Sequence, residues 1–225
     1  VSTRKAIELK PDFAQAHSNL GLLLKDLGNL EEAELSFRKT IELKPNFAQA
    51  FSNLGLLLRD LGNLEEAELS LRKAIKFNPD FVEAHYNLGL LLRDLNKLKE
   101  AELSQRKAIE LNPNFADAYS NLGNILKNSG NLKEAELLLR KAIEINPNFA
   151  DAHNNLGTIL RDLGKLEEAE LSTLKAIEIN SNFADAHNNL GTILKDLGKS
   201  KEAELSIRKA IELKPHFQMA HCNLG

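Results

Sequence analysis

The chain of 225 residues contains no tryptophan and only one cysteine, one methionine and two tyrosines. A single cysteine, Cys222, cannot form an internal disulfide, which fits a reducing compartment and leads us to expect a cytoplasmic protein. Uninterrupted apolar runs are only a few residues long, so the sequence holds no membrane-spanning segment and no signal-peptide core. With so few aromatic residues, the core has to be built from leucine, isoleucine and alanine.

Charge of one sign is not in excess either. The sequence has 29 basic and 32 acidic residues, interspersed along the chain, and a net charge of −3. Nucleic-acid-binding proteins usually gather a basic excess on one face, so we expect no nucleic-acid partner and no membrane partner. The hydrophobic share of 43% and the charged share of 27% are ordinary for a folded domain.

What the sequence does contain is a set of small residues and prolines that recur every 34 residues along the whole chain. Glycine and alanine keep the repeat without a gap, and the series of prolines is interrupted once, at Ser181. A period held this strictly indicates one structural unit that is stacked repeatedly. The recurring residues are Gly21, Gly55, Gly89, Gly123, Gly157, Gly191 and Gly225, Ala33, Ala67, Ala101, Ala135, Ala169 and Ala203, and Pro11, Pro45, Pro79, Pro113, Pro147 and Pro215.

Each repeat is predicted to form two helices, as the first full repeat illustrates. A first helix is predicted to run through residues 17–27, with Asp12 as its N-cap and Gln15 completing a capping box. Gly28 supplies the left-handed residue that ends this helix, and in one unit Asn96, the next-best residue for that conformation, replaces the glycine.

A second helix is predicted over residues 30–43. Asn29 precedes it and can cap its N-terminus. Pro45 follows it and cannot continue a helix. Between the two helices, Gly21 and Ala33 lack bulk and permit a close approach, around which we expect leucines such as Leu24 and Leu35 to pack.

The pattern resembles the tetratricopeptide repeat (TPR) family, whose signature places an aromatic residue, Leu-Gly, a second aromatic residue, Ala, Phe and Pro at fixed spacings. The resemblance implies an all-α fold, a right-handed superhelical solenoid of helix-turn-helix units. The first aromatic position holds a histidine in most units, which we interpret as a replacement within the core. In the first full repeat the signature falls on His17, Leu20, Gly21, Leu24, Ala33, Phe37 and Pro45. We expect one array over residues 1–225, with full repeats 14–47, 48–81, 82–115, 116–149, 150–183 and 184–217 between partial repeats 1–13 and 218–225.

Two features concern the stability and the ends of this array. Gln105 and Thr173 stand where other repeats place a large apolar residue, so their repeats are expected to open first. Val1 and Gly225 fall inside predicted helices, so the chain is expected to be part of a longer array. Its uncovered apolar ends are expected to allow end-to-end self-association.

A periodic stripe of polar residues on the first helices predicts a binding site. In the repeat 150–183, Asp151, Asn155 and Thr158 recur at helical spacing and share one face. An asparagine amide donates and accepts hydrogen bonds at once, so a row of asparagines about 10 Å apart can bind the backbone of an extended peptide. The family resemblance places this face on the concave side, and the repeats resemble those of O-linked N-acetylglucosamine transferase, which carry a similar asparagine ladder. The expected peptide-binding residues are Asn19, Asn53, Asn87, Asn121, Asn155 and Asn189, with Asp117, Asp151, Asp185, Thr158, Thr192, Arg59, Arg93 and Arg161.

Several other functions compete with this hypothesis. Each asparagine can instead tie neighbouring helices together. A clamp for a terminal carboxylate is disfavoured, because Asp117 and Asp151 would repel it. A metal site is disfavoured because His153 and His187 lie on helices about 10 Å apart. We therefore predict a non-enzymatic protein-interaction module without a cofactor that binds a protein or an extended peptide. The alternatives are a self-associating scaffold and the targeting arm of a glycosyl- or sulfotransferase.

Overall fold

The computed structural model describes residues 2–224, and every regular element within them is an α-helix. Contacts between Cα atoms divide the chain into two compact units, each containing several repeats. We call Val1–Pro113 the first unit and Asn114–Gly225 the second unit. Val1 and Gly225, where the sequence predicted interrupted helices, lie outside the described residues. The helices are α1 (Ser2–Leu9), α2 (Ala14–Asp26), α3 (Leu30–Leu43), α4 (Ala48–Asp60), α5 (Leu64–Phe77), α6 (Val82–Asp94), α7 (Leu98–Leu111), α8 (Ala116–Asn128), α9 (Leu132–Ile145), α10 (Ala150–Asp162), α11 (Leu166–Ile179), α12 (Ala184–Asp196), α13 (Ser200–Leu213) and α14 (Gln218–Leu224).

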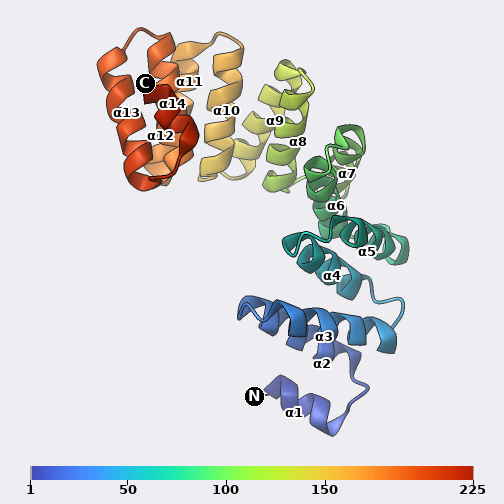
Figure 1. Ribbon diagram of the computed structural model, residues 1–225. Helices are drawn as coiled ribbons and strands as arrows, with labels where there is room; N and C mark the ends of the chain where they lie inside the picture. Colours follow the sequence, from blue (N-terminus) through green and yellow to red (C-terminus); the bar gives the residue numbers. More distant parts are fainter. Residues whose placement is uncertain (1, 225) are drawn as a thin grey trace. The chain divides into compact units, whose positions relative to one another are not determined.

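The predicted all-α helical-repeat fold is confirmed, and in each unit the helices stack as pairs (Figure 1). We call the first helix of each pair the A helix (α2, α4, α6, α8, α10, α12 and α14) and the others the B helices. The left-handed residues between A and B helices are also confirmed. Gly28 has φ 78° and Asn96 has φ 58°, a region that glycine and asparagine enter at the lowest cost.

The predicted capping box at Asp12 is wrong. α2 begins at Ala14 with Phe13 as its N-cap residue, and no side chain caps it. The cause is a turn in which the Phe13 backbone N–H donates to the Lys10 carbonyl oxygen at 3.1 Å, which places Asp12 outside the helix. Gln15 donates instead to the Asn19 side chain. Asn29 does occupy the N-cap position of α3, but its side chain makes no capping bond.

The core of each repeat lies between its A and B helices, where glycine allows close packing. A Cβ atom placed on Gly21 would lie only 2.6 Å from Cε1 of Phe37, which is fully buried. Leu24 joins this core as predicted, but Leu35 does not, since it is 68% exposed. Ala33 and Phe37 are buried on one face of α3, and Leu35 lies two residues after Ala33, which places it on the opposite face of the helix.

Ion pairs connect successive B helices of one unit. Glu136 of α9 accepts hydrogen bonds from Arg140 of the same helix and from Lys165, which precedes α11, at 2.8 Å. The same arrangement joins Glu68 to Arg72 and to Lys97 in the first unit. The hydrogen bond from Lys165 is the largest influence that lowers the pKa of Glu136 below its ordinary value of 4.5, and Arg140 adds to it, while burial opposes both.

This lowered pKa predicts an acid-sensitive contribution to stability. A carboxylate whose pKa is depressed in the folded state stabilises the fold above its unfolded pKa, and the contribution is lost as the pH falls through the folded pKa. The variant Glu136→Gln should therefore be less stable than the wild type at pH 7, and the difference should shrink below about pH 4. Urea unfolding at pH 7 and pH 3.5 measures both. Glu178→Gln, which removes an exposed partner of Lys175, is the control and should change stability little at either pH. A difference for Glu136→Gln that is unchanged at pH 3.5 would contradict this assignment.

Candidate functional site

The face that carries the asparagines lies on the A helices. Within each unit, the backbones of successive A helices approach one another, for example α4 with α6 and α10 with α12. Among the described residues, successive B helices are bridged only by side chains. Helices that are closer together lie on the inner side of a bend. The A helices of each unit therefore line its inner face, which we call the asparagine face.

The asparagines differ in how far they reach this face. Asn19 is exposed, and Asn121, Asn155 and Asn189 are half-buried. Exposure was expected at every position, but Asn53 and Asn87 are only 7% and 8% exposed. The side chain of Asn53 accepts a hydrogen bond from Gln49, and its own amide nitrogen is buried with no partner among the described residues.

The hydrogen bonds of the remaining asparagines show that some of them tie helices together. Nδ2 of Asn189 donates to Oδ1 of Asn154, one repeat earlier, at 2.9 Å, and Asn223 donates in the same way to Asn188. Asn121 donates to the carbonyl oxygen of Asp117 within its own helix. The alternative role of these amides, a tie between neighbouring A helices, is thus present in the second unit. An amide with one bond made still has a second N–H to donate and further acceptor capacity.

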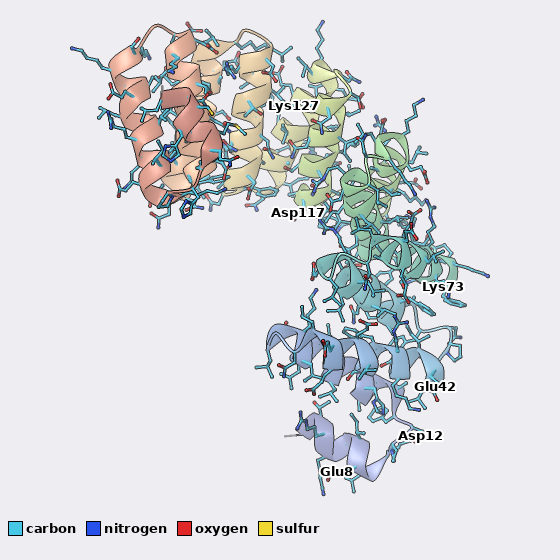
Figure 2. All side chains as sticks on the ribbon, viewed as in Figure 1. Glu8, Asp12, Glu42, Lys73, Asp117 and Lys127 are labelled. Atoms are coloured by element: carbon cyan, nitrogen blue, oxygen red, sulfur yellow. The ribbon has the colours of Figure 1, made fainter. Side chains whose placement is uncertain are left out.

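The other predicted residues surround the asparagines in the second unit. Asp117, Asp151 and Asp185 are exposed in the first turns of their helices. Figure 2 shows Asp117 at one end of α8 and Lys127 at the other. Lys127 donates to Oγ1 of Thr158 at 3.1 Å, and Thr158 donates to the backbone of its own helix. Thr192 makes the same backbone bond in α12.

The predicted arginines already have anionic partners on the protein. Arg59 pairs with Asp94 of the next repeat at 2.6 Å, and Arg161 pairs with Asp196 in the same way at 2.5 Å. Arg93 also contacts Asp94. The pairs of Arg59 and Arg161 cross from one A helix to the next, so these guanidinium groups contribute to the contact between repeats.

The histidines have a role that the sequence analysis missed. In each of five repeats, Nε2 of the histidine donates to the carbonyl oxygen six residues earlier, in the loop between repeats, at 2.8–3.0 Å. His153, for example, binds the Pro147 carbonyl. Their interpretation as core residues is wrong, because they are half-buried or exposed and hold this loop to the A helix. The fixed spacing of proline and histidine was the available signal.

Two other features are absent from the described residues. Residues 2–224 contain no group of three or more His, Cys, Asp or Glu side chains placed to hold a metal ion. Among the same residues, no helix has both the length and the apolar character that crossing a membrane requires.

These features define the class of the protein, an all-α helical-repeat protein, and comparison identifies the family. A model described as "TPR repeat" matches residues 55–93, 89–130 and 157–198, which together cover more than half of the chain. Models described as "Tetratricopeptide repeat" match residues 14–47, 116–149 and 184–217, and residues 36–68 and 138–170. The chain belongs to the tetratricopeptide repeat family, as its motif predicted, and repeats of this family generally serve as non-catalytic modules for protein–protein interaction. No curated protein sequence matches the chain.

Solved structures of TPR proteins resemble this one. The crystal structure of YrrB is 27% identical over 83% of this chain and 96% of its own, with a TM-score of 0.64. MamA is 28% identical over 72% of this chain and 95% of its own, also with a TM-score of 0.64. A chain of the APC/C hetero-tetramer Cut9–Hcn1 matches 99% of this chain with a TM-score of 0.87 at 16% identity, a likeness of fold alone. This chain spans 44% of the length of that one.

Proposed function

We propose that the asparagine face binds an extended segment of a partner protein through hydrogen bonds to the backbone of that segment. The observation that carries the proposal is Asn155. Its side chain is half-buried on the inner face of the second unit and makes no hydrogen bond to another described residue. Its amide can therefore offer both a donor and an acceptor to a peptide group.

The residues around Asn155 favour an extended backbone over a terminal carboxylate. Asp151 precedes Asn155 by one helical turn, and Asp185 occupies the same place in the next repeat, both exposed. Two carboxylates at the rim would repel a terminal carboxylate but leave the neutral peptide group unaffected. The similar TPR protein YrrB is described as having an unusual peptide-binding site, and this likeness also supports a peptide ligand.

The test is the variant Asn155→Ala. Peptides are first selected on the wild-type chain from a random peptide library, and their affinities are then measured by titration. Loss of up to two hydrogen bonds, each contributing about 0.5–1.5 kcal/mol, should weaken binding by about fivefold to a hundredfold. The melting temperature should stay the same or rise, because alanine gains up to about 0.7 kcal/mol of helix propensity over asparagine.

Asn189→Ala provides the contrasting variant. It removes the donor to Asn154, which is 6% exposed, and leaves that buried oxygen without its partner. The free energy of unfolding should fall by about 1–3 kcal/mol. If Asn155→Ala also lowers the melting temperature by several degrees, or binds the selected peptides as the wild type does, then the asparagines serve the architecture and the proposal is wrong.

A further inference from the structure

The opposite face of each unit, formed by the B helices, is hollowed between repeats. In the first unit a cavity of ≈ 460 Å³ lies between α5 and α7. Its apolar lining consists of Ile75 of α5, Leu88 of α6 and Leu103 of α7. In the second unit a cavity of ≈ 490 Å³ has the equivalent lining between α9 and α11. Both volumes lie within the range of about 300–1,000 Å³ that ligand pockets have. The cavities arise because the backbones of successive B helices stay apart within a unit, so that only side-chain ion pairs such as Arg72–Glu100 bridge them.

The two cavities differ in charge at one position. At equivalent positions of the repeat, the lining residues of the two cavities are of the same type, with one exception. Lys76 of the first cavity corresponds to Glu144 of the second. Glu168 also lines the second cavity, whereas the first has no acidic lining residue. The first cavity is therefore basic and the second is not.

Lys76 also removes a pairing that the other B helices keep. In α3 the ammonium group of Lys39 pairs with Glu42 at 2.9 Å, and α1, α7, α9, α11 and α13 have the same Lys-Glu pair. In α5 the residue at the glutamate position is Lys76, so Lys73 lies over the Phe51 ring instead, 5.6 Å from its centroid. Within residues 2–224, Lys76 has no ion-pair partner, whereas the charge of Lys73 acts on the carboxylate of Glu66.

The remaining cations of the first cavity are already neutralised. Arg72 pairs with Glu68 and with Glu100, at 2.8 and 2.5 Å. Lys107 pairs with Glu110 at 2.6 Å. Lys76 is exposed at the rim and carries a charge that no carboxylate of the described chain offsets.

An apolar surface also continues beyond this rim. Phe77 follows Lys76 directly, is 42% exposed, and stacks on Phe51 with 5.5 Å between ring centroids. Figure 2 shows Lys73 on the same side of the first unit as Glu42 of α3. The nearest acidic residue along the chain, Asp80, lies in the loop after α5 and does not line the cavity.

We propose that the cavity between α5 and α7 binds a leucine-type side chain of a partner protein whose flanking residues are aspartate or glutamate. The apolar lining accepts the side chain, and Lys76 attracts the flanking carboxylates, whereas Lys73 lines a separate cavity between α3 and α5. The site lies on the B helices and is independent of the asparagine face. The second cavity has the same apolar residues, with Leu160 in addition, but it does not attract this partner, because Glu144 stands in place of Lys76 and pairs with Lys141 at 2.7 Å.

The two cavities provide a matched exchange experiment. The probe is a fluorescein-labelled peptide with one leucine flanked on each side by two glutamates, titrated at low ionic strength and followed by anisotropy. The wild type should bind one equivalent. Lys76→Glu should weaken binding at least about fivefold, because an exposed attractive pair becomes repulsive. Glu144→Lys should create a second site and raise the stoichiometry from one peptide to two.

The controls separate this site from general charge and from the asparagine face. Lys209→Glu changes the net charge equally at a lysine that does not line either cavity, and should leave affinity unchanged. Asn155→Ala should also leave the affinity for this probe unchanged. Binding of the probe therefore tests the cavity alone, and the asparagine proposal is tested separately by the peptides selected for it. Circular dichroism melts establish that each variant is folded.

Three results would overturn the proposal. The first is no binding by the wild type, and the second is equal affinity of the wild type and Lys76→Glu. The third is equal binding when alanine replaces the leucine of the probe, because then charge alone is recognised. Vesicles of phosphatidylcholine with phosphatidylserine are tested in parallel, and Lys76-dependent binding to them without binding of the peptide would assign the patch to a lipid surface instead.

Discussion

Replacing Gln105 by leucine should raise the free energy of unfolding by about 1–3 kcal/mol, since a buried polar atom without a partner costs about this much. Gln105 of α7 is fully buried among the described residues. Its Nε2 donates to the Tyr86 carbonyl oxygen at 3.1 Å, but its Oε1 has no partner in residues 2–224. At the same place in the repeat, Leu71 and Leu139 are fully buried and apolar. Leucine would therefore remove an unpaired oxygen and bury apolar surface in its place.

The reciprocal variant provides the control. Leu139→Gln introduces the same amide into the second unit and should lower the free energy of unfolding by about 1–3 kcal/mol, for the same reason. Urea unfolding measures both variants. A less stable Gln105→Leu would contradict the assignment and would indicate that a bound water satisfies Oε1.

Hydrogen exchange gives a second measurement of the same feature. In repeat proteins stability is roughly a sum over repeats and their interfaces, so the repeat 82–115 should open first in the wild type and should gain protection in Gln105→Leu. Thr173 was also expected to be a weak point, but its hydroxyl donates to the Ala169 carbonyl oxygen at 2.9 Å. The repeat 150–183 should therefore exchange more slowly than 82–115.

Gly191→Ala should lower the free energy of unfolding by about 2 kcal/mol, as overpacking of a filled core does. A Cβ atom on Gly191 would overlap Cγ1 of Ile207 and would lie 3.1 Å from the backbone oxygen of Ala203. Ile207 is fully buried and β-branched, so it has few alternative rotamers. The gain of about 1 kcal/mol in helix propensity from glycine to alanine is smaller than the cost of this overlap.

A double variant tests whether the overlap is the cause. In an Ile207→Ala background the overlap with the Ile207 side chain is removed and only the contact with the Ala203 oxygen remains, so Gly191→Ala should cost clearly less there. Gly198→Ala is the control, because Gly198 has φ 76° and no neighbouring atom within 4 Å of an added Cβ. It should cost about 1–2 kcal/mol through backbone conformation alone, and Ile207→Ala should not rescue it. Equal effects of Gly191→Ala in both backgrounds would exclude the steric explanation.

The asparagine face shows where prediction from the sequence succeeded and where it could not. The spacing of Asp151, Asn155 and Thr158 placed them on one helical face, and this required only the helix period. It could not show that Asn189 donates to Asn154, because that partner belongs to another repeat. Nor could it show that Arg161 is paired with Asp196. The cavities between B helices were missed for the same reason, since two helices from different repeats form each of them.

The sequence by itself determined the all-α class, the repeat and the C-terminal ends of the A helices. These depend on local properties, such as the left-handed conformation at Gly28 and Asn96, which act over one or two residues. Tertiary structure decided which side chains are buried, which are paired and which remain available. Leu35 is exposed while Phe37 is buried, and the side chain of Asn189 donates to Asn154 while that of Asn155 has no partner among the described residues. Burial depends on what covers each helix face. A period repeated in the sequence places equivalent residues at equivalent positions, but their neighbours differ from repeat to repeat. These neighbours decide whether an amide or a charge already has a partner within the protein or is free to bind one outside it.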